Sequence, residues 1–277
     1  KTAAITGAAS GIGRMLAVRL AKEGCHLAIA DIDGTGLQKT AALIGAGVKV
    51  STHITDVSER EEVSRFAEEA VQCHGGVDIV INNAGVALAD FLETVPLEDF
   101  EWLMDIDFWG VVYGTMAFLP HLRKRPEGHL VNISSIYGIL PSVNTGTYCA
   151  AKFAVRGYTE TLAQEMRGTG IQVSCVYPGG IRTNIARSMR FNRALHALTR
   201  ESVQDIYESK LLRITADDAA KAIISGIKRN RRRIIIGAHA IFLDLAVRCF
   251  PVAFATLCAR VGDWVAASYA RKQSDKK

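Results

Sequence analysis

The chain has little proline, 6 residues among 277, and it lacks internal repeats and any linker rich in Pro, Gly or Ser. Hydrophobic residues make up 49% and charged residues 22%, which is typical of a folded domain rather than of a disordered or collagen-like chain. The length allows one large domain or two small ones. Because no linker or repeat divides the chain, we expect a single domain over residues 1–277.

The cysteines lack the spacing of a metal site or of a CxxC motif, and a chain of this length needs no disulfide framework. We therefore expect no bound metal, and we interpret all 6 cysteines as reduced thiols of a cytoplasmic protein. They are Cys25, Cys73, Cys149, Cys175, Cys249 and Cys258.

A strong excess of charge of one sign and a long uninterrupted apolar run are also absent. The net charge of +5 is too small to indicate a nucleic-acid partner. The most apolar stretch, residues 238–267, is interrupted by charged residues and by Pro251, which an isolated transmembrane helix of about 20 apolar residues does not tolerate. No targeting segment precedes residues 2–6, which already resemble a buried strand, so we expect that such a segment was removed or never existed.

What is present is an alternation of short apolar β-type runs with longer amphipathic segments. The β-type runs lie near residues 2–6, 26–30, 48–53, 77–82, 128–134, 171–177 and 232–237. Thr215 opens the last helical segment as an N-cap, and three earlier segments end in glycines that suit C-terminal caps, Gly24, Gly75 and Gly168. Continuous apolar strands linked by helices are typical of a parallel sheet covered on both faces. The pattern predicts a single-domain α/β fold of the Rossmann type, a doubly wound parallel sheet of about seven strands.

Three glycines follow the first strand, in the run Thr6-Gly7-Ala8-Ala9-Ser10-Gly11-Ile12-Gly13. Glycines at the start of a helix let backbone N–H groups approach a pyrophosphate at the positive end of that helix. The spacing differs from the common GxGxxG pattern, and an ordinary strand–helix turn remains the alternative.

The second strand ends in Asp31, whose carboxylate can accept hydrogen bonds from both hydroxyls of an adenosine ribose and would repel a 2′-phosphate. This residue predicts NAD rather than NADP as the cofactor. Ser10 and Ile32 occupy the positions at which a compensating cation would stand, although Arg14 is a candidate phosphate partner. The alternative is that Asp31 only caps the turn at Asp33-Gly34.

Short polar breaks also follow the third and fourth strands, at Asp56-Val57 and at Asn82-Asn83-Ala84-Gly85. In isolation each break could be a turn. In a doubly wound sheet both lie at the edge along which adenine and nicotinamide would run.

The fifth strand leads to Ser135, and further along the chain Tyr148 and Lys152 stand one helical turn apart, on one helix face. A phenol with a pKa of about 10 is a weak acid–base group at neutral pH, but a neighbouring ammonium favours the phenolate. The hydroxyl of Ser135 could hold a substrate oxygen. Without the other motifs, a purely structural Tyr–Lys pair would be the better interpretation.

Taken together, these motifs resemble the short-chain dehydrogenase/reductase (SDR) family, and they occur in the family's order across residues 1–185. The resemblance implies that Tyr148 is the catalytic acid/base and that Ser135 orients the substrate oxygen. It implies that Lys152 lowers the pKa of the tyrosine and binds the nicotinamide ribose, and that Ile181 and Thr183 contact the nicotinamide carboxamide. The implied cofactor site consists of Gly7, Ser10, Gly11, Ile12, Gly13, Asp31, Asp56, Val57, Asn83, Ala84, Gly85, Tyr148, Lys152, Pro178, Gly179, Ile181 and Thr183.

One position departs from the family pattern: Asp107 stands in the run Asp105-Ile106-Asp107-Phe108-Trp109-Gly110 where the family usually has asparagine. In the family that amide helps to hold a water of the proton relay that runs through the ribose and the lysine. A carboxylate of similar shape can still accept a hydrogen bond but lacks the amide donor. We therefore count Asp107 among the catalytic residues and expect activity with an altered pH profile.

In this family the substrate pocket is built from the segments after Gly85, around residues 136–147 and after Gly179. The matching residues here predict a hydrophobic alcohol or carbonyl substrate, and they are Val86, Leu88, Ile136, Tyr137, Leu140 and Val143. Phe91 and Ile139 lie in the same segments and are apolar too. The expected substrate lid, residues 186–214, begins with arginines at every third position, and the wider set is Arg182, Arg187, Arg190 and Arg193. These side chains could hold an acidic head group or a coenzyme A phosphate, but a solvated helix face is the preferred interpretation.

The lid divides the expected core, residues 1–185, from a last helix and strand over 215–237 and an apolar C-terminal extension over 238–277. The extension predicts two helices broken at Pro251. They could line the substrate pocket, seal a subunit interface or lie on a membrane surface. An oligomer contact or a pocket wall is the preferred interpretation, and peripheral membrane contact is not favoured.

The residues and the resemblance together predict an NAD-preferring oxidoreductase that transfers a hydride between nicotinamide and a hydrophobic secondary alcohol or ketone, assembled as a homodimer or homotetramer. A fatty aldehyde or fatty acyl-CoA reductase is the nearest alternative. A non-catalytic redox sensor that binds the dinucleotide is the alternative from another class, and intact Ser135, Tyr148 and Lys152 weigh against it.

Overall fold

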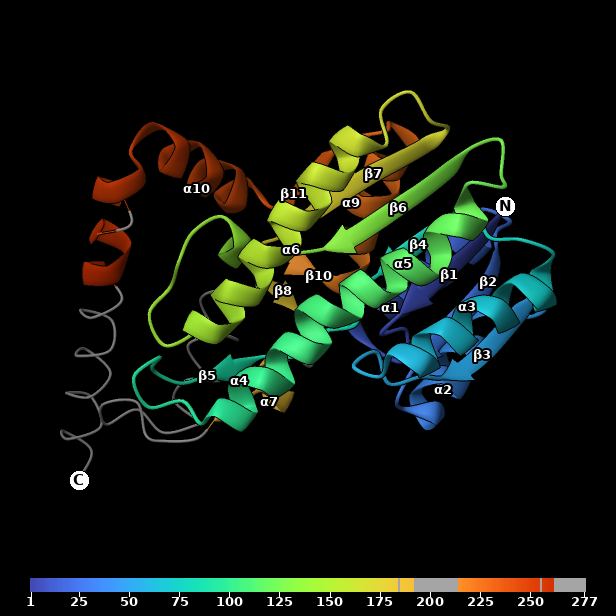
Figure 1. The fold of residues 1–277 in the computed structure, drawn as a ribbon, viewed down its shortest axis with the longest axis horizontal. Helices are drawn as coiled ribbons and strands as arrows, with labels where there is room; N and C mark the ends of the chain where they lie inside the picture. The colour runs from blue at the N-terminus through green and yellow to red at the C-terminus, as the bar shows by residue number, and fades with distance from the viewer. Residues whose placement is uncertain (184, 192–213, 255, 262–277) are drawn as a thin grey trace.

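The computed structural model describes residues 1–183, 185–191, 214–254 and 256–261 of the chain (Figure 1). Its centre is a parallel sheet of 7 strands in the order β11-β7-β6-β4-β1-β2-β3. Helices cover both faces of this sheet, which confirms the predicted single-domain, doubly wound α/β fold. The strands are β1 (Thr2–Thr6), β2 (His26–Asp31), β3 (Val50–Ile54), β4 (Ile79–Asn82), β6 (Gly128–Ile133), β7 (Ile171–Pro178) and β11 (Arg233–Ile236).

Successive residues of the central strands supply the two faces of the sheet. In β1 the side chains of Ala3 and Ile5 pack on one face and that of Ala4 packs on the other. Ile79 and Ile81 of β4 join the same face as Ile5. Because helices bury both faces, apolar side chains are needed at every position, and the strands form continuous apolar runs in the sequence.

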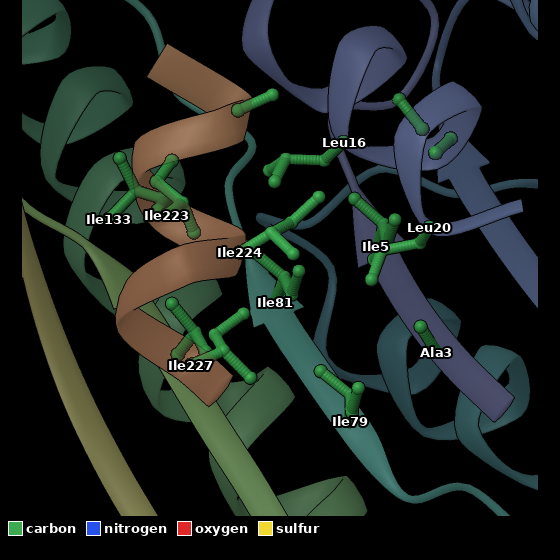
Figure 2. Packing of buried hydrophobic residues seen from close by; sticks show 14 of the residues in the cluster. Ala3, Ile5, Leu16, Leu20, Ile79, Ile81, Ile133, Ile223, Ile224 and Ile227 are labelled. Atoms are coloured by element: carbon green, nitrogen blue, oxygen red, sulfur yellow. The ribbon is translucent and has the colours of Figure 1, made fainter. Parts of the chain in front are cut away.

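The first face carries α1 (Gly11–Lys22), α2 (Gly34–Ile44) and α9 (Ala216–Lys228). Figure 2 shows Ile223, Ile224 and Ile227 of α9 packed with Leu16 of α1 and with the isoleucines of β4. Each fully buried isoleucine of this kind contributes about 1.5–3 kcal/mol of burial free energy. The packing therefore fixes α1, whose first turn borders the site.

The second face carries α3 (Arg60–His74), α5 (Gly110–Leu122) and α6 (Gly146–Glu165). The rings of Phe66 and Phe118 meet edge to face between α3 and α5, with centroids 5.3 Å apart. Helix α4 (Leu97–Met104) and a π-helical segment, η1 (Asp105–Trp109), lead directly into α5. Helix α6 packs against β7 and is thereby held beside the carboxyl ends of β6 and β7.

The end signals of the predicted helices agree with the structure. Thr215 caps α9, because its Oγ1 accepts the N–H of Asp218 at 3.0 Å. Strand β4 begins at Ile79 and not at residue 77, and the carboxylate of the preceding residue, Asp78, accepts the N–H of Thr2 at 2.7 Å. Left-handed backbone, in which glycine is unstrained, occurs at all three predicted caps, Gly24, Gly75 and Gly168.

Two short parallel strand pairs lie beyond the carboxyl ends of the main sheet. Strand β5 (Leu88–Ala89) pairs with β9 (Arg190–Phe191), and β8 (Ile181–Arg182) pairs with β10 (Ile214–Thr215). The short helix α7 (Ile185–Ser188) lies between β8 and β9 in the chain. Strands of two residues have no period, so the sequence pattern does not predict them.

The C-terminal extension begins with α10 (Ala238–Cys249), and helix resumes at residues 251–254 and 256–261. Asp244 fixes α10 to the sheet by an ion pair with Arg233 of β11 at 2.9 Å. Elsewhere on its surface α10 exposes large apolar side chains, those of Ile241, Phe242 and Leu245. Within the part of the chain that the structure describes, no helix is both long and apolar enough to cross a bilayer.

Candidate active site

The candidate site lies at the carboxyl ends of the central strands. Strands β1 and β4 are neighbours in the sheet. After β1 the chain continues to β2 on one side, and after β4 it continues toward β6 on the opposite side. Doubly wound sheets bind their ligands at such a switch point. In Figure 1 the arrowhead of β6 points toward the side on which α4, β5, β8 and α10 lie.

The loop between β1 and α1 is built so closely that its glycines cannot carry side chains. Gly7 has φ of 66°, and a Cβ there would lie 2.7 Å from the Cα of Ala84. A Cβ on Gly13 would overlap the carbonyl oxygen of Gly7. The glycines therefore bring the loop against β4 and leave its outer side open to a ligand.

The first turn of α1 fits a phosphate. Ser10 is the N-cap residue in extended backbone, and its side chain makes no capping hydrogen bond. The cap residue thus leaves the first backbone N–H groups of α1 without a capping side chain, which is the donor set that helix N-termini offer to anions. A Cβ on Gly11 would lie 3.3 Å from Thr183, so the segment after β7 comes within contact of this loop.

Asn83 holds the glycine loop through its side chain. Its amide donates to the carbonyl oxygens of Thr6 at 2.9 Å and of Gly7 at 3.1 Å. In return, Thr6 Oγ1 accepts the N–H groups of Asn83 at 3.0 Å and of Ala84 at 3.1 Å. Because both carbonyl oxygens that the Asn83 amide binds belong to Thr6 and Gly7, this side chain positions the glycine loop of the predicted cofactor site.

The carboxylate of Asp31 is fixed beside the same loop. Its Oδ2 accepts the N–H of Ala9 at 2.9 Å, and its Oδ1 accepts the N–H of Asp33 at 3.1 Å. The N-cap of α2 is Asp33, whose Oδ1 accepts the N–H of Gly36 at 2.9 Å. Asp31 therefore does brace the turn, but the capping itself is done by its neighbour.

Arg14 does not point freely toward a nucleotide. Its Nε donates to Thr40 Oγ1 at 3.0 Å, and its guanidinium also donates to the carbonyl oxygens of Ala9 and Gly36. These contacts tie α1 to α2. They occupy the side chain that the sequence offers as a phosphate partner.

Two further residues of the predicted cofactor site lie after β3. Asp56 Oδ1 accepts hydrogen bonds from the backbone N–H of Ser58 at 2.9 Å and from its hydroxyl at 2.6 Å. Val57 is buried, and a Cβ on Gly110 of α5 would lie 2.9 Å from it. Side-chain contact with a ligand is therefore open to Asp56 and not to Val57.

Ser135, Tyr148 and Lys152 come together where β6 ends against α6. Ser135 Oγ accepts the N–H of Tyr137 at 3.1 Å, which leaves its O–H to donate, and the side chains of Ser135 and Tyr148 are hydrogen bonded. Lys152 Nζ lies 5.5 Å from the centroid of the Tyr148 ring. The rings of Tyr137 and Tyr148 meet edge to face at 6.2 Å.

Burial and charge compete at this phenol. Burial raises the pKa of Tyr148 above its usual value, while the charge of Lys152 and the hydrogen bond from Ser135 act to lower it. The ammonium thus acts in the direction that the sequence predicts, but the net pKa of Tyr148 is raised because desolvation of the phenolate is the larger effect.

The comparison with known proteins now decides the family. The family model for short chain dehydrogenase matches residues 1–194. The chain belongs to the short-chain dehydrogenase family. SadH of Mycobacterium tuberculosis, named as an oxidoreductase, is 40% identical over 262 residues, which are 94% of this chain and 94% of SadH.

Solved structures agree with this assignment. An SDR of Burkholderia phymatum in complex with NAD has a TM-score of 0.83 at 30% identity, over 90% of this chain and 92% of that one. An alcohol dehydrogenase of Thermococcus sibiricus complexed with 5-hydroxy-NADP has a TM-score of 0.72 at 26% identity, over 85% and 95% of the two chains. This short-chain dehydrogenase is thus an oxidoreductase, and likeness alone does not choose between NAD and NADP.

The predicted substrate residues of this short-chain dehydrogenase differ in exposure. Val86 and Tyr137 are partly buried and contact the clusters around the site, while Val143 is 45% exposed. The other three, Leu88, Ile136 and Leu140, are buried. Leu88 packs into a core with Leu103 and Ala151.

A second group of apolar residues packs with Tyr148, and apart from Phe91 its members were not predicted. It comes from the β5–β9 pair and the segments beside it, and its members are Ala87, Ala89, Phe91, Ile185, Met189 and Phe191. The group combines residues some hundred positions apart in the chain. The apolar character of residues 86–91 is a signal in the sequence, but the pairing with residues 190–191 is not.

The segment after β7 is held by α10. Gly180 N–H donates to His239 Nε2 at 3.3 Å, and a Cβ on Gly179 would collide with the same imidazole. Ile181 is buried in the main core, whereas Thr183 is partly buried. Of the predicted residues after Pro178, Thr183 therefore has the side chain nearest the glycine loop, by its approach to Gly11.

The predicted arginine stripe is only partly within the described residues. The side chain of Arg187 and the whole of Arg193 lie outside them. Arg190 is engaged by α4: its NH1 group lies 2.6 Å from Asp99 Oδ1, and its guanidinium carbon lies 3.5 Å from the centroid of the Trp102 ring. Arg190 therefore fastens β9 to α4.

Metal ligands were sought among the residues that the structure describes. These contain no group of three or more His, Cys, Asp or Glu side chains placed to hold a metal ion. The six cysteines are free thiols.

Proposed function

We propose that this short-chain dehydrogenase transfers a hydride between NAD(H) and a hydrophobic secondary alcohol or ketone, with Tyr148 as the acid/base. One observation carries the proposal: the hydroxyls of Ser135 and Tyr148 and the ammonium of Lys152 meet at the carboxyl edge of the sheet. The glycine loop that fits a pyrophosphate lies at the same edge.

The cofactor would be held by residues that leave room for it. The backbone of Gly7 to Gly13 would bind the pyrophosphate, and Asp31 would accept the hydroxyls of the adenosine ribose. Asp31 and the engagement of Arg14 by Thr40 both favour NAD over NADP. When bound, the nicotinamide supplies or accepts the hydride.

The side chains then divide the remaining work. Ser135, whose oxygen accepts the Tyr137 N–H, would turn its O–H from Tyr148 to a substrate oxygen. Tyr148 donates its proton to that oxygen in reduction and recovers it in oxidation. The ammonium of Lys152 favours the charged form of Tyr148 that arises in reduction.

An apolar substrate fits the surroundings of Tyr148. The ring packs against a cluster in which Ala87 and Ala89 come from the β5 segment and Met189 and Phe191 from the β9 segment beside it. A pocket of this composition gains free energy by taking apolar surface out of water, at about 25 cal/mol per Å². The engagement of Arg190 by Asp99 and Trp102 weighs against an acidic head group at that residue.

Steady-state rates with NADH and NADPH against apolar ketones, aldehydes and acyl-CoA esters test the proposal. We expect turnover of ketones with NADH, and loss of about 100- to 10,000-fold of kcat in Tyr148→Phe with NADH binding retained. Tyr158→Phe, a matched change on the same helix, should keep full activity. Tight NADH binding without turnover of any substrate would instead identify a redox sensor, and reduction of the thioester would identify an acyl-CoA reductase.

We also propose assembly into a homodimer or homotetramer. The outer sides of α5 and α6 support it, because they expose the apolar side chains of Met116 and Phe153. Light scattering after size-exclusion chromatography tests it. A monomer at micromolar concentration would contradict the proposal.

A further inference from the structure

A buried carboxylate, that of Asp107, lies against the amine of Lys152. Asp107 Oδ2 is 3.0 Å from Lys152 Nζ, and the two side chains are 0% and 5% exposed. Asp107 belongs to η1 and Lys152 to α6, so the ion pair joins two separate elements beside the catalytic tyrosine. A pair shielded from water in this way interacts far more strongly than one on the surface.

The surroundings of the carboxylate fit aspartate better than the asparagine that the family usually has here. Oδ1 accepts the N–H of Val86 at 2.7 Å, while Oδ2 faces the ammonium. Among the described residues Oδ2 has no hydrogen-bond donor, so the ammonium meets it as an ion pair. An amide has one acceptor and one donor, so in either orientation of an asparagine an NH₂ group would face a donor.

We propose that Asp107 is a positioning residue that pins the ammonium of Lys152 beside Tyr148 and sets the pH range of activity by its negative charge. The inference rests on the proposed function, in which Tyr148 exchanges the proton. Asp107 acts through Lys152, which links η1 to the catalytic helix α6.

The groups that face Tyr148 come from each element around it. Lys152 approaches from its own helix, Asp107 acts from η1, Ser135 lies at the end of β6, and Tyr137 lies on the short 3₁₀ helix η2 (Ile136–Gly138). Strands β5 and β9 contribute the apolar cluster. Among the residues that the structure describes, the largest charge effects on the phenol thus come from the two partners of one ion pair.

These two charges have opposite effects. Burial is the largest effect on the pKa of Tyr148 and raises it. The charge of Lys152 lowers the same pKa, and the charge of Asp107 raises it. For Lys152, burial is the largest effect and acts to lower the pKa, but the raising effects of Asp107 and Tyr148 together leave the pKa raised. Removal of the Asp107 charge should therefore lower the pKa of both groups.

The sign of the expected pH effect follows. Alcohol oxidation needs a Tyr148 that can accept a proton, so the rate falls at low pH, where the phenol holds its proton. It also needs a charged Lys152, so the rate falls again at high pH. In Asp107→Asn both limits should move to lower pH, by roughly one unit or more, because an opposing charge in a buried site shifts pKa values by that amount.

The test is the pH profile of kcat/KM for alcohol oxidation at saturating NAD, in the wild type and in Asp107→Asn. The matched control is Asp78→Asn, because Asp78 is also buried, pairs with Arg125 at 2.7 Å and lies at the opposite end of β4. We expect a downward shift of both limits in the first variant and an unchanged profile in the second. An unchanged or upward profile in Asp107→Asn overturns the inference.

A second measurement needs neither cofactor nor activity. Urea unfolding of Asp107→Asn, Lys152→Met and the double variant gives the coupling between the two side chains. We expect the double variant to be clearly more stable than the sum of the two losses predicts, because each single change leaves a buried group without its partner. Additive losses would refute the pinning of Lys152, and Asp107→Ser replaces the asparagine variant if that protein does not fold.

The outcomes separate this inference from the proposed function. If Tyr148→Phe keeps its activity, the proposed function fails while the unfolding cycle still tests the ion pair. If Tyr148→Phe is inactive and Asp107→Asn keeps the wild-type pH profile, only the role of Asp107 is refuted.

Discussion

An Asp31→Asn substitution removes one negative charge from the nucleotide end of the site and keeps the shape of the side chain. The carboxylate is held by the N–H groups of Ala9 at 2.9 Å and Asp33 at 3.1 Å, so its position is set by the backbone on both sides. A ribose bound along the glycine loop would present its hydroxyls to the remaining lone pairs of Asp31. The substitution therefore removes the charge and also one of the two backbone hydrogen bonds, because an amide has a single acceptor oxygen.

The expected magnitude follows from two effects. A 2′-phosphate at about 4 Å from the carboxylate is opposed by roughly 4 kcal/mol per unit charge at an effective dielectric constant near 20. Asp31 is partly exposed, so solvent screening halves this to about 2 kcal/mol. Loss of charge-assisted bonding to the ribose weakens NADH by about 1.5 kcal/mol. Together these effects favour NADPH by about 3.5 kcal/mol, or roughly 300-fold.

The assay compares kcat/KM for NADH and NADPH with one apolar ketone. The wild type should prefer NADH, and Asp31→Asn should shift the ratio of the two values toward NADPH by about 100-fold or more. Asp33→Asn is the matched control, because it removes the same charge two residues away and asparagine caps a helix as well as aspartate does. A wild type that prefers NADPH, or equal ratios in both variants, would refute the use of Asp31 as the selecting residue.

Three further predictions concern the glycine loop, strand β9 and the stability of the fold at low pH. Gly13→Ala should abolish NADH binding in fluorescence titration, since its Cβ would overlap the Gly7 carbonyl, and binding within threefold of wild type would disprove the packing argument. Arg190→Ala removes the contact with Trp102, so the KM for ketone should rise about 3- to 10-fold while that for NADH stays constant; equal changes in both would contradict it. Burial lowers the pKa of His129 from 6.5 to about 4, so the unfolded chain binds the proton first and stability falls as pH drops below 6.5. His129→Gln should remove about 2 kcal/mol of the stability difference between pH 7 and pH 5 in urea unfolding, and an unchanged difference would exclude this histidine as its source.

The fold was largely predictable because the information for it is local. Each central strand is an apolar run, and in β1 this follows from the burial of Ala3, Ala4 and Ile5 on both faces. Helix ends carry their own signals, as the cap at Thr215 shows. The starts of strands were less predictable: Asp78 lies just before β4, and its carboxylate binds the N–H of Thr2, which is far away in the chain.

The candidate site was predictable where one segment contains the whole motif. The glycine loop lies in consecutive residues, and Tyr148 and Lys152 share one helix face. The apolar group around Tyr148 was not predictable, because it depends on the pairing of Leu88–Ala89 with Arg190–Phe191. The π-helical turn at Asp105–Trp109 also carries no sequence period of its own.

The sequence by itself therefore determined the doubly wound sheet, the glycine loop, the acidic end of β2 and the Ser135, Tyr148 and Lys152 set. Those features depend on residue type and short spacing, which fix local backbone and local chemistry. Only the tertiary structure decided what lies across from each group: Asp107 against Lys152, Arg190 against Trp102, and His239 against the segment after β7. Such contacts join residues that are distant in the chain, and their energies depend on separation and burial, which exist only once the chain is folded.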